Sequence, residues 1–489
     1  MGKVELQLEL PPNMTWTLAD VLAATGGTVA SGSLEPLEFD SISTDTRRLE
    51  PGALFVALTG PTQEGERFAA DALARGARAV LVRHLPENVP ADRAIVVADP
   101  LTALGDLAAW TRRRLAPTVI GITGSNGKTT TKEMVASVCE RASFSAPRSG
   151  VLKTVGTENN LIGLPLTLLR LAEQDAVAVL EMGMSEPGEI SRLTEIANPD
   201  VGVVTNVGPV HLEGCGDLAG VAAAKGELFH GMRAGATIAV NLDDDWVVKI
   251  AACFPGRRIN FGRHGEVRPG AVADFGLDGV AFDLDVAGRT TKVRLRLPGL
   301  HNLTNALAAA AVTHATGIDV ETIRAGLEAI AAPPKRMQVV RLANGTTLLN
   351  DSYNANPANV AAAIEVLTRQ SGRAVAVLGE MRELGPESAT LHRSIGQLAA
   401  QRGVAVLVAV GAQAAAMVDG ARQAGMAESS LHTCTDPGAA AALVTTLWRA
   451  GDLILVKGSR GPATEEVVRL RGSRMAEVVR LLEEAGGLS

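Results

Sequence analysis

The sequence predicts an α/β protein built from three domains. Its 489 residues correspond to about three domains of ordinary size. Short β-branched runs alternate with Ala- and Leu-rich stretches almost throughout, a pattern typical of largely parallel sheets covered by helices. Hydrophobic residues make up 46% of the chain but aromatic residues only 3%, so we expect cores of Ala, Val, Leu and Ile.

The first two domains are predicted from runs of strand-forming residues. Residues 1–100 are predicted to form a small N-terminal α/β domain, to which the resemblance described below assigns the substrate, with strands expected in "GALFVAL", "AVLVR" and "AIVVAD". Residues 101–332 form a central P-loop ATPase-like domain with a mostly parallel sheet, whose expected strands are "TVIGIT", "AVAVLEM", "VGVVTNV" and "TIAVNLD". An alternating β segment ("KVRLRLPG") and two helices, 301–317 and 319–330, complete it.

The third predicted domain, residues 333–489, is a Rossmann-like α/β domain. "AAPPKR" (331–336) is predicted to be a linker because its two prolines stop a helix. An Asn-Gly pair between two apolar runs in "MQVVRLANGTTLLND" predicts a hairpin. Strands expected in "RAVAVLGEM", "VAVLVAVG" and "DLILVKGSR" then alternate with helices.

Charge and cysteine content exclude several classes of protein. A net charge of −7 argues against a broad nucleic-acid-binding face. The four cysteines lie far apart without a CxxC pair, which excludes a zinc ribbon or disulfide framework and fits a reducing compartment. No apolar run is long enough to span a membrane, and the N-terminus lacks the apolar core of a signal peptide. We therefore expect a cytoplasmic protein.

"TVIGITGSNGKTTTKEM" (118–134) has the pattern of a phosphate-binding loop between a strand and a helix. Glycines let backbone N–H groups face phosphate oxygens, and the helix N-terminus adds positive potential. Lys128 would reach the β- and γ-phosphates, and the Thr129 hydroxyl would ligate Mg²⁺. The loop departs from the standard pattern, since Ile122 stands where its first glycine is expected. A glycine-rich turn that binds nothing is the alternative.

Polar residues follow two predicted strands of the central domain. Glu181 ends one strand and His211 follows another, so both should reach the carboxyl edge of a parallel sheet beside the phosphate loop. Glu181 suits Mg²⁺, which prefers carboxylate and phosphate oxygens. A satisfied edge carboxylate, a structural histidine and, for Lys225 in "GVAAAKGELF", a solvated helix lysine remain open alternatives.

These motifs and their order along the chain resemble those of the Mur ligase family, which are ATP-dependent amide-forming enzymes of bacterial peptidoglycan synthesis. "TGSNGKTT" is similar to the family's phosphate loop, His211 in "GPVHLEGCGDL" matches its second-metal histidine, and Lys225 matches its carbamylated lysine. The resemblance implies ATP and two Mg²⁺ ions as cofactors. Lys128, His211 and Lys225 are its implied catalytic residues, and Thr129, Glu181, His211 and carbamylated Lys225 its implied metal ligands.

Two further stretches extend the implied ATP site. "LPGLHNLTNALAAAA" is similar to the family's nucleotide-recognition helix, and Arg336 and Asp351 match an Arg and an Asp that embrace the phosphates and ribose. Tyr353, the single tyrosine, is interpreted as a flat wall beside the nucleotide. The implied ATP-binding residues are Gly124, Ser125, Asn126, Gly127, Lys128, Thr129, Thr130, Asn302, Asn305, Arg336, Asp351, Tyr353 and Asn354.

"NDSYNANP" (350–357) and "LGEMRELGPES" (378–388) resemble the family member that adds D-alanyl-D-alanine to UDP-N-acetylmuramoyl-tripeptide through an acyl phosphate. Asn350 departs from the Asp that is common there. The substrate-binding residues that the resemblance implies are Ser43, Thr44, Asp45, Arg47, Thr157, Asn159, Asn160, Lys457 and Arg460. A monomer is expected, and the proline-containing linker is interpreted as a hinge.

Two alternatives remain for the function. A tripeptide-forming Mur ligase would add a different amine, but the DNPR motif of that member is missing here. A non-catalytic nucleotide-binding scaffold is the alternative from another class of protein. A scaffold has no need of the implied second-metal ligands.

Overall fold

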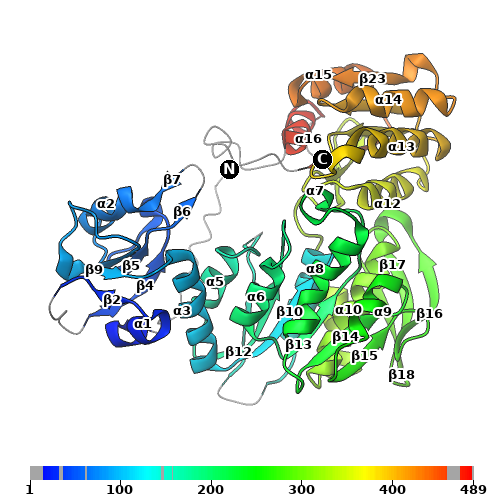
Figure 1. Ribbon diagram of the computed structural model, residues 1–489. Helices are drawn as coiled ribbons and strands as arrows, with labels where there is room; N and C mark the ends of the chain where they lie inside the picture. The colour runs from blue at the N-terminus through cyan, green and yellow to red at the C-terminus, as the bar shows by residue number, and fades with distance from the viewer. Residues whose placement is uncertain are drawn as a thin grey trace.

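The computed structural model describes residues 15–31, 37–60, 63–144, 148–156, 158–459 and 474–486. Three main sheets, each formed by a separate stretch of chain, are flanked by helices (Figure 1). This arrangement confirms the predicted α/β class with three domains. The boundaries after residues 100 and 332 remain our proposal. No helix within the described ranges combines the length and apolar character that a membrane crossing requires.

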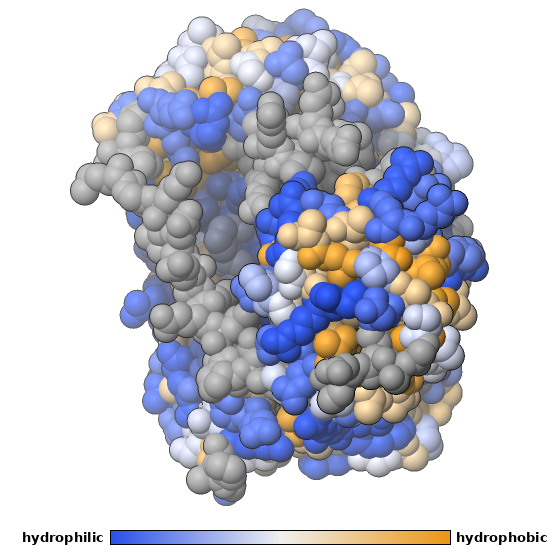
Figure 2. Space-filling view, turned by 90° about the vertical axis from the view of Figure 1, so that its left-hand side faces the viewer, coloured by the Kyte–Doolittle hydropathy of each residue, from blue (hydrophilic) through white to orange (hydrophobic). Residues whose placement is uncertain are grey.

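The N-terminal sheet has five strands in the order β2-β9-β8-β5-β4. Strands β4, β5, β8 and β9 pair in parallel, and only β2 is antiparallel to its neighbour. From the side of this sheet, Figure 2 shows a mainly hydrophilic surface interrupted by small hydrophobic patches. The strands are β2 (Thr28–Val29), β4 (Ser41–Ser43), β5 (Ala53–Val56), β8 (Ala79–Val82) and β9 (Ala94–Val96).

Helix α3 (Pro100–Leu115) joins this sheet to the central domain. Asp99 caps it by accepting a hydrogen bond from the N–H of Thr102 at 2.8 Å. Pro100 stands in the first turn, where a missing N–H breaks no helical hydrogen bond. The indole of Trp16 donates to the hydroxyl of Thr111 at 3.0 Å. Because α3 shares one hydrophobic cluster with N-terminal strands and central helices, it fastens the two domains together.

The central sheet has nine strands in the order β11-β12-β10-β13-β14-β15-β16-β17-β18. Its strands pair in parallel from β11 to β16, while β16, β17 and β18 form an antiparallel extension. The strands are β10 (Thr118–Thr123), β11 (Gly150–Lys153), β12 (Asp175–Glu181), β13 (Val201–Val204), β14 (Thr237–Asn241), β15 (Arg257–Phe261), β16 (Val267–Asp274), β17 (Val280–Val286) and β18 (Arg289–Leu295).

The order of these strands positions the site. Strand β10, which leads into the phosphate loop, lies between β12 and β13. The parallel pairing brings the carboxyl ends of all three strands to one edge, as expected for a ligand site in such a sheet. Hydrophobic clusters lie on both faces of the sheet. The central helices are α4 (Lys128–Cys139), α5 (Gly163–Leu168), α6 (Glu189–Ala197), α7 (Leu212–Cys215), α8 (Leu218–Gly231), α9 (Asp245–Ala251), α10 (His301–Ala315) and α11 (Val320–Ala329).

The C-terminal sheet has six strands in the order β19-β20-β24-β21-β22-β23. Strands β19 and β20 form the predicted antiparallel hairpin, and Gly345 in its turn has a φ of +83°, which favours glycine. The other pairs are parallel. The strands are β19 (Gln338–Arg341), β20 (Thr347–Asp351), β21 (Ala374–Leu378), β22 (Val406–Val410), β23 (Leu431–Cys434) and β24 (Leu453–Lys457). The α-helices are α12 (Pro357–Thr368), α13 (Ser388–Gln401), α14 (Ala414–Gln423), α15 (Pro437–Leu447) and α16 (Arg474–Gly486).

Helix α11 packs closely against α4, the helix that follows the phosphate loop. The hydroxyl of Ser137 on α4 donates to the carbonyl of Gly326 on α11 at 2.8 Å. A Cβ added at Gly326 would lie 2.4 Å from the Cα of Val138, closer than real side chains approach. The glycine therefore lets the two helix backbones meet.

Gly326→Ala should separate these helices and destabilise the protein. We expect the free energy of unfolding to fall by about 1–3 kcal/mol, as for other overpacked interiors, and the midpoint of thermal unfolding to fall with it. Gly235→Ala is the matched control, because a Cβ there meets no atom within 4 Å. Equal midpoints for the two variants would contradict the tight packing described above.

Candidate active site

A cavity of about 770 Å³ lies between the central and C-terminal domains. The central domain contributes the phosphate loop, the end of β12, the loop after β13 and the start of α10. The C-terminal domain contributes residues beyond the linker, the end of β20 and the first turns of α12. Most of the predicted ATP-binding and metal-binding residues, far apart in the sequence, thus line one cavity, whereas Gly124 and Lys225 do not line it.

Two glycines allow the phosphate loop its shape. Gly124 has a φ of +144°, and a Cβ there would lie 1.9 Å from the hydroxyl of Thr205. Gly127 has a φ of +82°, and a Cβ there would lie 2.1 Å from the side-chain oxygen of Asn305. Both glycines therefore meet a steric requirement. The departure at Ile122 does not alter this, because Ile122 is a buried residue of β10.

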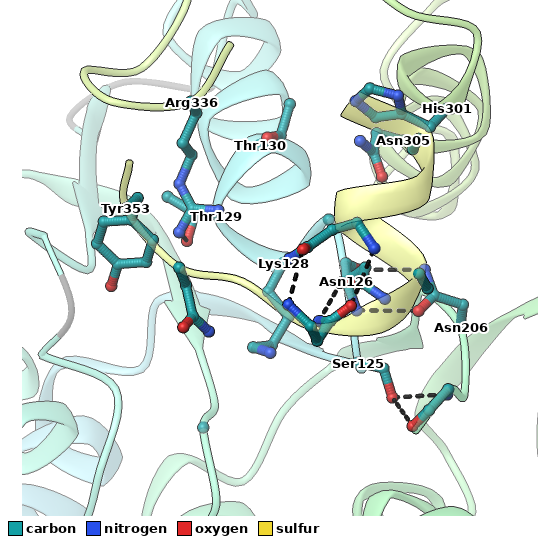
Figure 3. A pocket seen from close by; sticks show the side chains of 18 of the residues that line it. Ser125, Asn126, Lys128, Thr129, Thr130, Asn206, His301, Asn305, Arg336 and Tyr353 are labelled. Carbon is teal, nitrogen blue, oxygen red and sulfur yellow. Dashed lines mark hydrogen bonds between the residues drawn. The ribbon is translucent and has the colours of Figure 1, made fainter. Parts of the chain in front are cut away.

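The loop after β13 holds the phosphate loop from one side (Figure 3). The N–H of Asn126 donates to Oδ1 of Asn206 at 2.9 Å, and Nδ2 of Asn206 donates to the carbonyl of Asn126 at 3.0 Å. The hydroxyl of Ser125 accepts from the N–H of Gly208 at 2.8 Å. These bonds order the loop, as preorganised anion sites require.

Thr129 and Glu181 meet as the sequence predicts. The hydroxyl of Thr129 donates to Oε2 of Glu181 at 2.7 Å, and Nδ2 of Asn159 donates to Oε1 at 2.8 Å. Glu181 is only 2% exposed. Nη2 of Arg336 donates to the same threonine hydroxyl at 2.8 Å. A buried carboxylate, a hydroxyl and an amide NH₂ group therefore converge beside the loop.

Two lysines lie near this point. Nζ of Lys128 donates to the carbonyl of Gly124 at 2.6 Å, and burial lowers the pKa of the Lys128 ammonium, although the charge of Glu181 opposes that shift. Lys225 on α8 is 1% exposed, and burial lowers the pKa of its ammonium far below the usual value, with the charge of Lys128 adding to the effect. Within the described residues, Lys225 makes no hydrogen bond or ion pair.

His211 lines the cavity from the loop after β13. Its Nδ1 contacts Oε2 of Glu383, a residue of the C-terminal domain. The hydrogen bond to the His211 ring lowers the pKa of the Glu383 carboxyl, although burial opposes the shift. No group of three or more His, Cys, Asp or Glu side chains suited to a metal is present in the described part of the chain. The predicted ligand set would have to rely on Thr129 and a modified Lys225 as well.

The predicted nucleotide residues line the other walls. Arg336 stacks over the ring of Tyr353 at 4.0 Å from its centroid, and both stand on one side of the loop, opposite His301 and Asn305 (Figure 3). Nδ2 of Asn305 donates to Oδ1 of Asn302 at 3.0 Å. Tyr353, predicted to be a flat wall beside the nucleotide, is thus part of a stacked pair, because the guanidinium of Arg336 covers its ring.

Asp351, Asn354 and Lys457 form a connected group. Nζ of Lys457 donates to a carboxylate oxygen of Asp351 and, at 2.9 Å, to the carbonyl of Asn354. The N–H of Met337 donates to the other carboxylate oxygen of Asp351 at 3.1 Å. All three predicted residues line the cavity, as does Thr130. Lys457 is 2% exposed and is committed to Asp351 in this arrangement.

The predicted substrate residues are not all brought together. Asn159 and Asn160 line the cavity. Asp45 and Arg47 form a two-pronged ion pair in the N-terminal domain, with Nε–Oδ1 and Nη2–Oδ2 distances of 2.8 Å, and Ser43 hydrogen-bonds to Asp45. Neither these three nor Thr44 lines the cavity. Thr157 and Arg460 lie outside the described residues.

Several residues of the cavity were not predicted. Asn206 and His301 line it, as do Asn356 and Glu383 of the C-terminal domain. Nδ2 of Asn356 donates to Oδ1 of Asn126 at 2.7 Å, which links α12 directly to the phosphate loop. Asn356 caps the start of α12, and the Asn-Ala-Asn-Pro pattern is the local signal that could have identified this cap. Its partner 230 residues away could not be read from any local pattern.

This fold is that of an α/β protein with a phosphate loop at a cavity between two of its domains. Matches to known families follow the same division. Residues 38–111 match the Mur ligase family catalytic domain, 122–313 the Mur ligase middle domain, and 335–460 the Mur ligase glutamate ligase domain. The chain therefore belongs to the Mur ligase family and is an ATP-dependent ligase.

Individual relatives are similar to this chain in sequence and structure over most of its length. The UDP-N-acetylmuramoyl-tripeptide–D-alanyl-D-alanine ligase of Escherichia coli is 37% identical, over 90% of this chain and 96% of the relative. The crystal structure of MurF from Acinetobacter baumannii superposes with a TM-score of 0.85 at 31% identity, covering 95% of this chain and 100% of that chain. MurF from Thermotoga maritima in complex with ADP gives a TM-score of 0.77 at 27% identity, covering 91% and 97%.

Asn206→Ala should weaken nucleotide binding without unfolding the protein. The substitution removes two side-chain hydrogen bonds to Asn126, so the loop loses its preset shape and the Kd for ADP should rise about tenfold or more. Isothermal titration calorimetry measures this change. Asn260→Ala, on β15 away from the loop, is the control. An unchanged Kd in Asn206→Ala would remove Asn206 from the site.

Proposed function

We propose that this ligase joins the terminal carboxylate of UDP-N-acetylmuramoyl-tripeptide to the amine of D-alanyl-D-alanine. The products are UDP-N-acetylmuramoyl-pentapeptide, ADP and phosphate. The supporting observation is that one cavity is lined both by the phosphate loop and by residues of the segment 350–357, which resembles dipeptide-adding ligases. A relative 37% identical over 90% of the chain carries the name of this activity.

The residues around the loop suit phosphoryl transfer from ATP to a carboxylate. Such a transfer requires positioning and charge neutralisation rather than a protein nucleophile. Backbone N–H groups of residues 127–130 and the ammonium of Lys128 would hold the phosphates, while Arg336 and Asp351 would hold the far side of the nucleotide. The amine of the dipeptide then attacks the acyl phosphate carbon, the C–N bond forms, and phosphate leaves.

The donor set fits Mg²⁺. The Thr129 hydroxyl and the Glu181 carboxylate lie 2.7 Å apart at the edge of the sheet, and Mg²⁺ prefers such oxygen ligands with phosphate oxygens completing its coordination. We assign a first ion to this pair and a second to His211, Glu181 and modified Lys225. When bound, the ions would neutralise the charge of the phosphates.

Lys225 suits carbamylation. Burial lowers the pKa of Lys225 and so favours its neutral amine, the form that attacks CO₂, and this amine makes no hydrogen bond or ion pair within the described residues. The nitrogen forms a bond to the carbon of CO₂ and loses one proton, which yields a carbamate anion. The modification places an anion near Lys128, and it removes the repulsion that a protonated Lys225 would exert on that lysine.

The remaining assignments concern the substrates. We assign Ser43, Thr44, Asp45 and Arg47 to the uridine diphosphate, and Thr157, Asn159 and Asn160 to the sugar nucleotide where it enters the cavity. Lys457 and Arg460 are assigned to the peptide end of the cleft. We further propose that the protein is a monomer located in the cytoplasm. Its domain boundaries are proposed to lie at 100/101 and 332/333.

ADP release across a matrix of UDP-muramoyl peptides and amines tests the function. Release should require both the tripeptide nucleotide and D-alanyl-D-alanine, whereas a tripeptide-forming ligase would use a dipeptide nucleotide and a scaffold would release none.

Lys128→Ala should lower kcat about a hundredfold, or roughly 3 kcal/mol, by loss of a preorganised charge. Lys292→Ala, an exposed lysine on β18, is the control. Normal turnover in Lys128→Ala would refute the assignment of the loop.

Lys225→Ala should be nearly inactive and should regain activity when a short carboxylic acid such as formate is supplied. The acid would replace the missing carbamate anion. Sodium chloride at equal ionic strength is the control for salt effects, and ¹³C NMR of wild-type protein in ¹³CO₂ should show one carbamate signal that this variant lacks. Full activity of Lys225→Ala without additive would refute the carbamate.

A further inference from the structure

The contact between His211 and Glu383 crosses the interface between the central and C-terminal domains. Nδ1 of His211 and Oε2 of Glu383 lie within hydrogen-bond distance, although the residues are 172 positions apart. The N–H of Glu213 also faces the carbonyl of Glu383 at 3.4 Å. Both His211 and Glu383 line the cavity. The contact therefore belongs to the wall of the active site.

The loop that presents Glu383 is held by its own domain. The N–H of Met381 donates to Nε2 of His392 at 2.9 Å, and Nδ1 of this buried histidine donates to the carbonyl of Ser388 at 2.7 Å. On the other side, the N–H of Arg382 donates to the hydroxyl of Ser459 at 3.1 Å. These anchors lie directly before Glu383, so the position of its carboxylate is set by the C-terminal domain.

Both members of the pair adopt a backbone conformation that L-residues rarely take. His211 has a φ of +53° and Glu383 a φ of +60°. Each such residue costs about 1 kcal/mol or more, and such strain persists where the surroundings impose it, commonly at functional sites. The two strained residues contact each other through their side chains across the domain interface. We infer that the fold maintains this strain because it holds the two side chains in contact.

The contact determines which nitrogen of His211 carries the proton. A carboxylate oxygen accepts, so Nδ1 donates and Nε2 of the neutral ring keeps its lone pair. No hydrogen bond to Nε2 is present within the described residues. Histidines that bind metals commonly donate their other ring N–H to a carboxylate, which fixes tautomer and ring orientation. The pair has the form that a metal-binding histidine requires.

We propose that Glu383 is the positioning residue of His211 and that docking of the C-terminal domain completes the second metal site. The inference rests on the metal role of His211 in the proposed function. With the domains apart, His211 would lose its carboxylate partner and could adopt either tautomer. The metal site would then mature only when Arg336 and Asn356 of the same domain have reached the phosphate loop, so that ATP is not spent before the cleft closes.

Binding of Mn²⁺ in the presence of a non-hydrolysable ATP analogue tests this proposal without turnover. Electron paramagnetic resonance of the full-length protein should show two bound ions, of which one binds about 10–100-fold more weakly in Glu383→Ala. Glu383→Gln keeps an acceptor oxygen and should retain most of the affinity. Glu387→Ala removes the same charge from the same region but from a residue that does not line the cavity, so it should bind Mn²⁺ as the wild type does.

A double-mutant cycle with His211→Ala separates positioning from a merely structural effect. If Glu383 acts through His211, Glu383→Ala should not weaken Mn²⁺ binding further in the His211→Ala background. Wild-type affinity in Glu383→Ala, or an equal loss in both backgrounds, would overturn the proposal. Failure of the proposed function would show instead as absent ADP release from wild-type protein whose two Mn²⁺ ions bind normally.

Discussion

The hydroxyl of Thr129 is the point on which the arrangement of the site depends. It donates to Glu181 at the end of β12 and accepts from Arg336, which lies beyond the linker between the domains. A single hydroxyl can do both, because it has one proton and two lone pairs. The residue that would ligate Mg²⁺ is therefore also hydrogen-bonded to the C-terminal domain. Asn126 has a comparable position, between Asn206 and Asn356.

The parts of the fold that follow local rules could be predicted from the sequence. The hairpin at Asn344-Gly345 and the capped helix start at Asn356 depend on neighbouring residues only. Strands β15 and β16 were not predicted, because "RRINF" is charged at one end and "VRPGAVAD" contains both Pro and Gly. They are strands because each is paired with a strand on either side, and this hydrogen bonding outweighs weak local propensity.

The candidate site divides in the same way. The loop glycines, Lys128, Thr129 and Glu181 could be predicted because a strand, a turn and a helix must follow one another in a fixed pattern. Asn206, Asn356 and Glu383 could not, since each acts through a partner that the tertiary fold supplies. Asn350 shows a further limit. Its buried amide oxygen accepts from the hydroxyl of Ser352 at 2.7 Å, so this residue supports the turn without adding a second negative charge beside Asp351.

The charges around the cavity explain why an anionic ligand belongs there. Burial lowers the pKa of both Lys128 and Lys225, and the charge of Arg336 also disfavours protonation of Lys128. The charge of Glu181 opposes this shift at Lys128. The positive charges of Lys128, Lys225 and Arg336 disfavour one another when no anion is bound. Phosphate groups at the loop would therefore be stabilised by these charges. The proposed carbamate acts in the same direction, because it converts the most deeply buried of these amines into a negative group. A bound nucleotide and a modified Lys225 would then each favour the charged form of Lys128, and the site would gain its full electrostatic strength only when both are present.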